Sequence, residues 1–355
     1  TVMLGVAIYS SLVIATRNLE ESYNYAYEKL NYADFTAYVN MAPKIVIDEI
    51  ENLNNVKNVE GRLSIGIGIE VSSDRQIPGL AIGLNSTRKP KVNDIKIIDG
   101  DYFDGVTLNE CILEQHFAGA YNYEINDEIT LLINGTRLNL TVKGIAASAE
   151  FLVVLSGPYE VSRGYTYGVI FIPIEILWRT LGLHGLVNEI CVKVIDKSTI
   201  DQTISEVKKV LRPYGIVRIV KGDEQPAYKI LRWDIEGFYE VAQTFSVLIL
   251  IVALIEIYTM LKRLVVSQRR EIGILKAIGY SKKHIALHYL LYSLLIGLIG
   301  SSLGVLASIF VSGSITRFYT RTLGIPFCII KLYTDVMITG VILGILACIL
   351  GAIIP

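Results

Sequence analysis

Three long apolar runs constrain this chain more than any other feature of its sequence. Val241–Leu261, Ile285–Val311 and Val336–Ile354 are each about 20 residues or longer, the length of a helix that crosses a hydrocarbon core of about 30 Å. Helices in the core of soluble proteins rarely remain apolar on every face over such a length. We therefore expect three membrane-spanning helices.

The first 17 residues form a fourth apolar run, which ends at Arg17. It shows neither the basic start nor the small-residue cleavage site of a signal peptide. We interpret residues 1–17 as a transmembrane helix whose beginning lies outside this sequence. The composition agrees with a membrane protein, because only 19% of the residues are charged, against about 25% in an average soluble domain.

The segment between the second and third predicted spans sets the orientation. It contains Glu271 as its one acidic residue, and its seven basic residues are Lys262, Arg263, Arg269, Arg270, Lys276, Lys282 and Lys283. Short loops with such an excess of lysine and arginine remain in the cytosol. Residues 18–235 and 312–335 are then expected on the outer side of the membrane.

Residues 18–235 have the alternating patterns of a globular α+β domain. The spacing of Leu19, Tyr23 and Tyr27 continues the first span as a helical stalk. Asn134-Gly135 predicts a tight hairpin turn. A helix is expected to start after Pro173, and another to be capped by Ser198 or Thr199.

The predicted fold class is a membrane protein with four transmembrane α-helices and a large α+β extracytoplasmic domain inserted between the first and second spans. The predicted boundaries are 1–17 for the first span, 18–235 for the outer domain with its stalks, 236–261 for the second span, 262–283 for a cytosolic loop, 284–311 for the third span, 312–335 for an outer loop and 336–355 for the fourth span.

Several kinds of chemistry find no support in the sequence. No Gly-Lys dipeptide occurs, so a phosphate-binding GxxxxGK[ST] loop is absent, and neither GxSxG nor HExxH is present. The cysteines Cys111, Cys191, Cys328 and Cys348 have no CxxC spacing. Cys111 and Cys191 could pair, but we favour two free, buried thiols. We predict no catalytic residue, no bound cofactor and no metal site, and therefore no enzyme.

Polar and small residues inside the spans suggest two further roles. Glu256 is either a functional intramembrane acid or a side chain that extends toward the cytosolic interface, about two turns before Lys262. Glycines three or four residues apart allow close helix approach, and we predict helix packing at these positions: Gly297, Gly300, Gly304, Gly340 and Gly344.

The cytosolic loop carries an apolar pattern as well as charge. Ile272, Leu275 and Ile278 follow one another at i, i+3 and i+6, which predicts a short amphipathic helix able to enter a groove of a partner. Its basic residues Arg269, Arg270 and Lys276 would complement an acidic surface. Gly279 would end this helix, and Ser281 would cap the next one. If the charges only fixed the topology, the apolar pattern would have no explanation.

The stretch "RREIGILKAIGYSKKHI", residues 269–285, resembles the signature loop of the FtsX-like, MacB-type permeases of ABC systems. Arg269 or Arg270 fills the basic position of that signature. The other matching residues are Glu271, Ile272, Gly273, Leu275, Lys276, Ala277, Gly279 and Ser281. Residues 111–145 are similar to the outer core domain of the same family, with Asn126 where a glycine is common.

The resemblance implies a permease subunit of the plasma membrane that works with a cytosolic ABC ATPase on a separate chain. ATP and Mg²⁺ would be bound by that partner. The family also implies a homodimer or a pair with a homologous permease, contact with membrane lipid, an extracytoplasmic protein partner and no nucleic acid. Its members act as mechanical transmitters for efflux or extraction of peptides, lipoproteins or drug-like molecules.

A second hypothesis is a membrane-anchored receptor or scaffold that regulates an extracellular cell-envelope protein. A membrane-bound hydrolase is disfavoured, since no catalytic constellation is found. The sequence alone does not decide which cargo or envelope protein would be involved.

Overall fold

The structure is a computed structural model that describes residues 1–72, 74–107, 109–156, 160–162 and 164–353. The chain divides into two compact units. The helical unit comprises Thr1–Ser22, Trp233–Arg321 and Cys328–Pro355, and the sheet unit comprises Tyr23–Arg232 and Thr322–Phe327.

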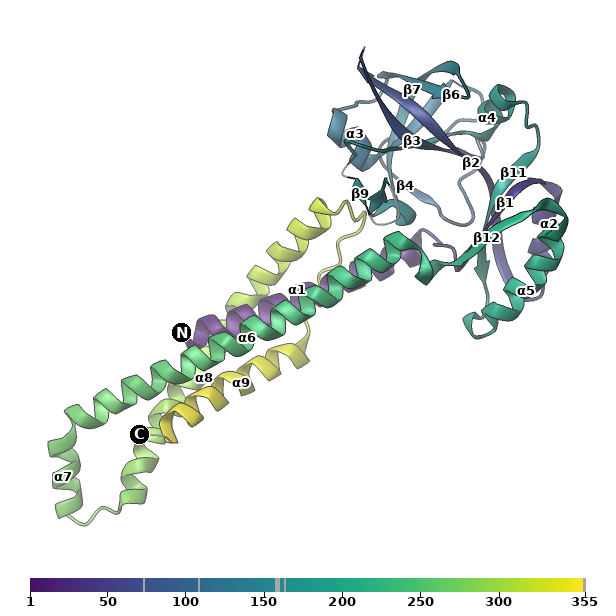
Figure 1. The fold of residues 1–355 in the computed structure, drawn as a ribbon. Coiled ribbons are helices and arrows are strands. Elements are labelled where there is room, and N and C mark those ends of the chain that lie inside the picture. The colour runs from purple at the N-terminus through teal and green to yellow at the C-terminus, as the bar shows by residue number, and fades with distance from the viewer. Residues whose placement is uncertain (73, 108, 157–159, 163, 354–355) are drawn as a thin grey trace. The chain divides into compact units, whose positions relative to one another are not determined.

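The helical unit is built from long apolar helices. Its elements are α1 (Val2–Lys29), α6 (Pro226–Ser267), α7 (Arg269–Ala277), α8 (Lys282–Thr322) and α9 (Thr334–Ile353). Four of them, α1, α6, α8 and α9, are long and apolar enough to cross a membrane, and they run alongside one another (Figure 1). Large apolar side chains such as Leu295 and Phe310 are exposed on this unit. The prediction of four spans is confirmed.

Two of these helices differ from the predicted segments in their length. α6 starts at Pro226, a residue suited to the first helical position, and reaches Ser267 without a break. α8 continues to Thr322, so the prediction of a loop from residue 312 is wrong for 312–322. Polar residues alone do not end a helix: the hydroxyls of Thr316 and Thr320 hydrogen-bond to carbonyls one turn back. The chain leaves the helical path near Gly324, whose φ is +63°.

The sheet unit is a mixed α+β domain. Among the described residues, ten strands form one sheet in the order β12-β1-β11-β2-β3-β10-β5-β7-β4, and β6 pairs with β2 and β7. The strands are β1 (Phe35–Pro43), β2 (Val56–Ser72), β3 (Arg75–Leu84), β4 (Ile95–Gly100), β5 (Glu110–Glu114), β6 (Glu128–Ile133), β7 (Thr136–Ser148), β10 (Gly168–Pro173), β11 (Leu186–Val194) and β12 (Ile216–Lys221). β8 (Val154–Leu155) and β9 (Val161–Ser162) pair separately. The pairs β3–β10 and β5–β7 are parallel.

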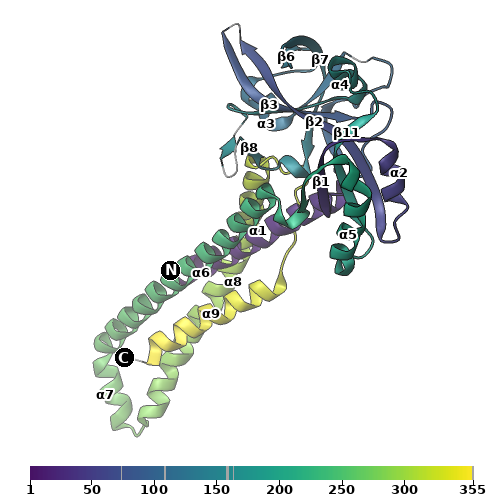
Figure 2. The ribbon, with the colours of Figure 1, turned by 45° about the vertical axis from the view of Figure 1, so that its right-hand side comes forward.

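The strand β2 joins the two halves of the sheet. Its first part pairs with β11 up to Arg62, and its second part pairs with β3 from Leu63 onward. The helices α2 (Ile45–Glu51) and α5 (Ile200–Leu211) pack on the β1–β11–β12 half, and α3 (Gln115–Tyr121) and α4 (Ile174–Leu181) on the other (Figure 2). The predicted α+β domain between the first and second spans is confirmed.

Local sequence signals explain several of these elements. The β6–β7 hairpin turns at Asn134 and Gly135, whose φ values are +48° and +81°, as expected for a two-residue turn. The helix after Pro173 is also found. The predicted cap of α5 is wrong: the side chains of Ser198 and Thr199 do not cap it. Instead, a 3-10 turn precedes α5, and Asp196 caps that turn by accepting from the Ser198 N–H.

The core of the sheet unit is apolar and closed. Phe35, Phe117 and Phe171 are almost fully buried, and each such side chain contributes about 1.5–3 kcal/mol relative to exposure. Cys111 and Cys191 are buried and unpaired, as the sequence favoured. The sheet unit therefore has a core of its own, separate from the helical unit.

Candidate functional site

The signature residues within 269–281, which the resemblance predicts to couple this chain to its ATPase, lie on and around α7, between α6 and α8. Gln268 precedes α7, and its side-chain oxygen accepts a hydrogen bond from the Tyr289 hydroxyl of α8 at 2.8 Å. At the other end Gly279 has a φ of +105°, which lets the chain turn sharply. Ser281 stands directly before α8, and its hydroxyl accepts from the His284 N–H at 3.5 Å. The local sequence thus forms a short helix between two turns.

The apolar residues of this segment lie on two faces rather than one. Leu275 and Ile278 are 39% and 71% exposed, and Ile274, which the sequence analysis did not select, is 52% exposed. Ile272 is half-buried and faces a groove within the helical unit. The prediction of one shared face is therefore wrong for Ile272, because its side chain lines this groove while those of Leu275 and Ile278 are exposed.

The remaining coupling candidates are exposed. The side chains of Arg269, Arg270 and Glu271 have solvent around them. A Cβ built on Gly273 would meet no heavy atom within 4 Å. A glycine inside a helix costs about 1 kcal/mol relative to alanine, and here the rest of the described chain gives no steric reason for it. Close approach of another backbone would explain it.

The predicted packing glycines lie at contacts between helices of the helical unit. A Cβ on Gly297 would lie 2.9 Å from the Cys348 sulfur, and one on Gly304 would lie 2.6 Å from the Met3 carbonyl oxygen. A Cβ on Gly340 would lie 2.6 Å from the Ser10 hydroxyl. Gly344 faces Ser301, and Gly300 is in ordinary contact range of Val2. These glycines bring α1, α8 and α9 together.

Glu256 lies on an exposed face of α6. Among the described residues it has no hydrogen bond or ion pair within the chain. Six residues further on, Lys262 stacks over the Tyr258 ring at 5.7 Å. Both interpretations of Glu256, as a functional acid and as a side chain reaching the interface, stay predictions.

The connection between α8 and α9 is fixed by polar contacts in each unit. In the sheet unit, Gln115 donates to the Gly324 carbonyl, and Lys96 donates to the Pro326 carbonyl at 2.7 Å. In the helical unit, Ser22 and Asn18 of α1 accept from the main-chain N–H groups of Ile329 and Lys331, each at 2.9 Å. The sequence analysis had treated this segment only as a loop.

His116 of α3 belongs to this contact. Its Nδ1 lies 2.6 Å from Glu114 Oε1, and its ring also hydrogen-bonds the main chain of Leu323. Burial lowers the pKa of His116, but the hydrogen bond and charge of Glu114 raise it, and the net pKa lies above its usual value. Two acceptors facing the two ring nitrogens favour the doubly protonated imidazolium.

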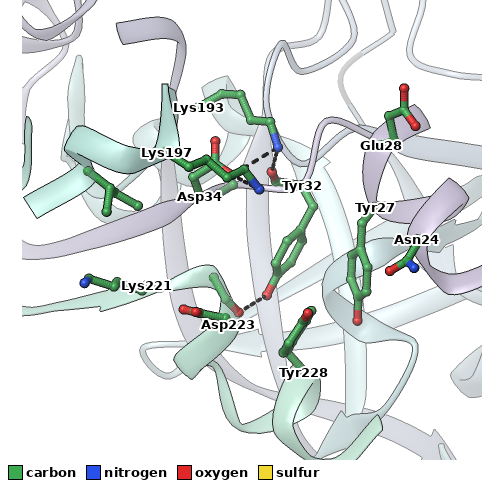
Figure 3. Close-up of a pocket in the computed structure, with 13 residues that line it drawn as sticks. Asn24, Tyr27, Glu28, Tyr32, Asp34, Lys193, Lys197, Lys221, Asp223 and Tyr228 are labelled. Carbon is green, nitrogen blue, oxygen red and sulfur yellow. Dashed lines mark hydrogen bonds and ion pairs between the residues drawn. The ribbon is translucent and has the colours of Figure 1, made fainter. Parts of the chain in front are cut away.

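A second polar site, a pocket of about 600 Å³, lies in the sheet unit at the end of α1 (Figure 3). Lys193 and Lys197 both contact Asp34 Oδ1, at 3.3 and 2.9 Å. Burial lowers the pKa of Lys193, against the charge of Asp34. Tyr27 lies across the pocket with its ring 4.7 Å from that of Tyr32. Because the central charges pair with one another, this site joins β11 to the short segment between α1 and β1.

Sequence reasoning missed this pocket. Asp34 and Lys193 are about 160 residues apart, and neither belongs to a motif.

A buried ion cluster lies where β2 passes between the two halves of the sheet. Arg62 is 3% exposed and donates to both oxygens of Glu150 and to Glu189. Ligand atoms of Glu150, Glu189 and Cys191 lie within 4.8 Å of one another. The Arg62 guanidinium already bridges the two carboxylates by hydrogen bonds, so the arrangement is better explained as an ion cluster than as a metal site.

Comparison with known proteins bears on the α6–α9 region. Residues 244–355 match the FtsX-like permease C-terminal family. This segment is therefore similar to the C-terminal domain of FtsX-like permeases. The resemblance expected from residues 269–285 is thereby confirmed. Over 252 residues, 70% of its length, the chain is 23% identical to an uncharacterized ABC transporter permease protein of Mycobacterium tuberculosis, and it spans 28% of that relative's length.

Two solved structures share features with this chain at 13% identity and a TM-score of 0.37. The extracellular domain of the noncanonic ABC-type transporter YknZ from Gram-positive bacteria matches over 52% of this chain and 100% of its own. The periplasmic region of MacB from Actinobacillus actinomycetemcomitans matches over 56% of this chain and 92% of its own.

The family match and the four apolar helices identify a multi-pass protein of the plasma membrane. The basic segment 262–283 places α7 in the cytosol. The sheet unit then lies outside the cytoplasm, as the sequence predicted.

Proposed function

We propose that this chain is the membrane subunit of an ABC-type complex and that α7 docks into a separate cytosolic ATPase. The observation that carries the proposal is the exposed apolar face of Ile274, Leu275 and Ile278 on a cytosolic helix. Such a face is unfavourable in water unless a partner covers it. The open space around Gly273 supports a closely approaching backbone, and the exposed Arg269 and Arg270 suit an acidic rim.

In this proposal the chain has no catalytic role of its own. ATP and Mg²⁺ are bound by the ATPase, and closure of two ATPase subunits moves α7 together with the spans of two permease subunits. The helix α1 runs unbroken from Val2 to Lys29, and α6 runs unbroken from Pro226 to Ser267, so each continues beyond its span as a stalk. A continuous helix is stiff enough to carry movement from the cytosolic side to the outer domain, where a peptide, lipoprotein or drug-like substrate would be displaced.

The test uses matched isoleucine variants. Ile278→Ala removes an exposed side chain of α7, whereas Ile195→Ala removes one that is 66% exposed on the sheet unit. We expect Ile278→Ala, and Leu275→Ala with Glu271→Ala, to lower co-purification of a candidate ABC ATPase and to reduce stimulation of its ATP hydrolysis. Ile195→Ala should change neither. Unchanged association in the α7 variants would refute docking and favour the receptor or scaffold.

A further inference from the structure

A groove lined by residues of α6, α7, α8 and α9 lies on the side of α7 opposite to its exposed apolar face, and it combines apolar and basic side chains. It has a volume of about 610 Å³ and is lined by apolar side chains from α6, α8 and α9, among them Val265, Ile285, Leu290 and Ile353. That volume lies within the range of about 300–1,000 Å³ found for small-molecule sites. Ile272 contributes an apolar side chain from α7 itself.

The charged residues of the groove are all basic. Lys276 reaches it from the last turn of α7, and Lys282 and Lys283 from the first turn of α8. Among the described lining residues there is no aspartate or glutamate, and these three lysines form no ion pair in the described part of the chain. Three positive charges without a counterion, beside the positive end of a 41-residue helix, favour an anion.

We propose that this groove binds one anionic phospholipid of the cytosolic leaflet. The phosphate would lie among Lys276, Lys282 and Lys283, and an acyl chain would cover the apolar wall. The segment lies at the cytosolic ends of the spans, where anionic headgroups gather and attract basic side chains. A free phosphate would leave the apolar wall uncovered, whereas each buried methylene of a lipid adds to binding.

Such a lipid would position α7. The helix is linked to α8 by the hydrogen bond between Gln268 and Tyr289 and by the turn at Gly279. A phosphate that contacts Lys276 on α7 and Lys282 on α8 would join the two helices a second time. It would thereby hold Ile274 and Ile278 outward. This inference goes beyond the proposed function, because it concerns the opposite face of α7 and needs no ATPase.

The experiment measures lipid binding to the purified full chain in mild detergent by native mass spectrometry. Phosphatidylglycerol, phosphatidylcholine and glycerol 3-phosphate are titrated separately. We expect phosphatidylglycerol to bind well and the other two to bind weakly. Replacing Lys276, Lys282 and Lys283 with alanine together should weaken phosphatidylglycerol binding roughly 100-fold, since each lysine near an anionic surface contributes about fivefold.

A control variant removes the same charge from outside the groove. Lys262, Arg263 and Arg270 are exposed and do not line the groove. Their joint replacement with alanine should weaken phosphatidylglycerol binding by less than about threefold, because only long-range, salt-screened attraction is lost. Ala286→Phe keeps every lysine but fills the groove, and it should also weaken binding. Replacing the three groove lysines with arginine should preserve it, which separates loss of charge from misfolding.

Three results would overturn the proposal. One is equal binding of phosphatidylcholine and phosphatidylglycerol. Another is an equal loss in the control variant, which would mean attraction to the surface as a whole. The third is binding of glycerol 3-phosphate as tight as that of the lipid, which would mean a free-phosphate site.

Discussion

Replacing Arg62 with leucine should destabilise the sheet unit by about 3–5 kcal/mol, the effect of removing one partner from a buried ion pair. Arg62 is 3% exposed, and its guanidinium nitrogens lie 2.6 and 2.9 Å from oxygens of Glu150 and Glu189. Leucine would fill part of the space but donate no hydrogen bond. Two carboxylates would then remain buried without a cation, at the point where β2 joins the two halves of the sheet.

The control is Arg137→Leu. Arg137 pairs with Glu70 at 3.0 Å, but its side chain is 72% exposed. Exposed pairs contribute about 0.2–1 kcal/mol, because water and salt screen the charges. The same substitution in two surroundings therefore separates the burial of the pair from the loss of an arginine.

The assay is urea unfolding of the full chain, followed by brief labelling of cysteine thiols and mass spectrometry. Cys111 is fully buried in the sheet unit and becomes reactive when that unit opens, while Cys328 is exposed and reports complete labelling. With a denaturant slope of about 2 kcal/mol per molar urea, Arg62→Leu should lower the midpoint for Cys111 by roughly 2 M.

The pH dependence of the effect of Arg62→Leu provides a second test of this explanation. Burial raises the pKa of Glu150, and the charge of Arg62 lowers it; without Arg62 this carboxyl should protonate more readily. The difference between Arg62→Leu and the wild type should therefore be larger near pH ~8 than near pH ~5. Equal midpoint shifts for Arg62→Leu and Arg137→Leu, or a difference independent of pH, would refute the account.

Three further predictions concern separate parts of the molecule. The pKa of His116 is raised in the folded state, so its contact with the α8–α9 connection is fully stabilising below the usual histidine pKa and weakens as the pH rises through the folded-state pKa. Hydrogen exchange of the Leu323 and Gly324 amides should therefore become faster over that pH interval. His116→Gln should abolish this pH dependence. Gly340→Leu should lower the free energy of unfolding of the helical unit by an amount typical of overpacking, about 1–3 kcal/mol, and hence lower its thermal midpoint, whereas Gly237→Leu, at an open position, should not. Gly135→Val should destabilise the β6–β7 hairpin by about 1–2 kcal/mol in thermal unfolding, since its φ of +81° disfavours a side chain while the space around it is open.

Features that depend on local sequence could be predicted from the sequence alone. A run of about 20 apolar residues such as Val241–Leu261 needs lipid whatever surrounds it, and the lysine and arginine excess in 262–283 sets its side of the membrane. The turn at Asn134-Gly135 and the break at Gly279 follow from the conformations that these residues tolerate. For that reason the spans, their orientation and the basic cytosolic loop could be predicted from the sequence.

Features that depend on distant partners needed the tertiary structure. The spacing of Ile272, Leu275 and Ile278 suggested one face, but in the structure Ile272 lines the groove shared with α6, α8 and α9, whereas Ile274 is exposed. The polar segment from residue 312 suggested a loop. In the structure the hydroxyls of Thr316 and Thr320 hydrogen-bond within α8, and the helix continues.

The ion cluster of Arg62 and the lysines that contact Asp34 had no signal in the sequence, because their partners lie 88 to 163 residues away along the chain. Hydropathy and backbone preference act over a few residues and can be inferred from sequence. Charge pairing in a core depends on which strands become neighbours, and only the folded sheet decides that.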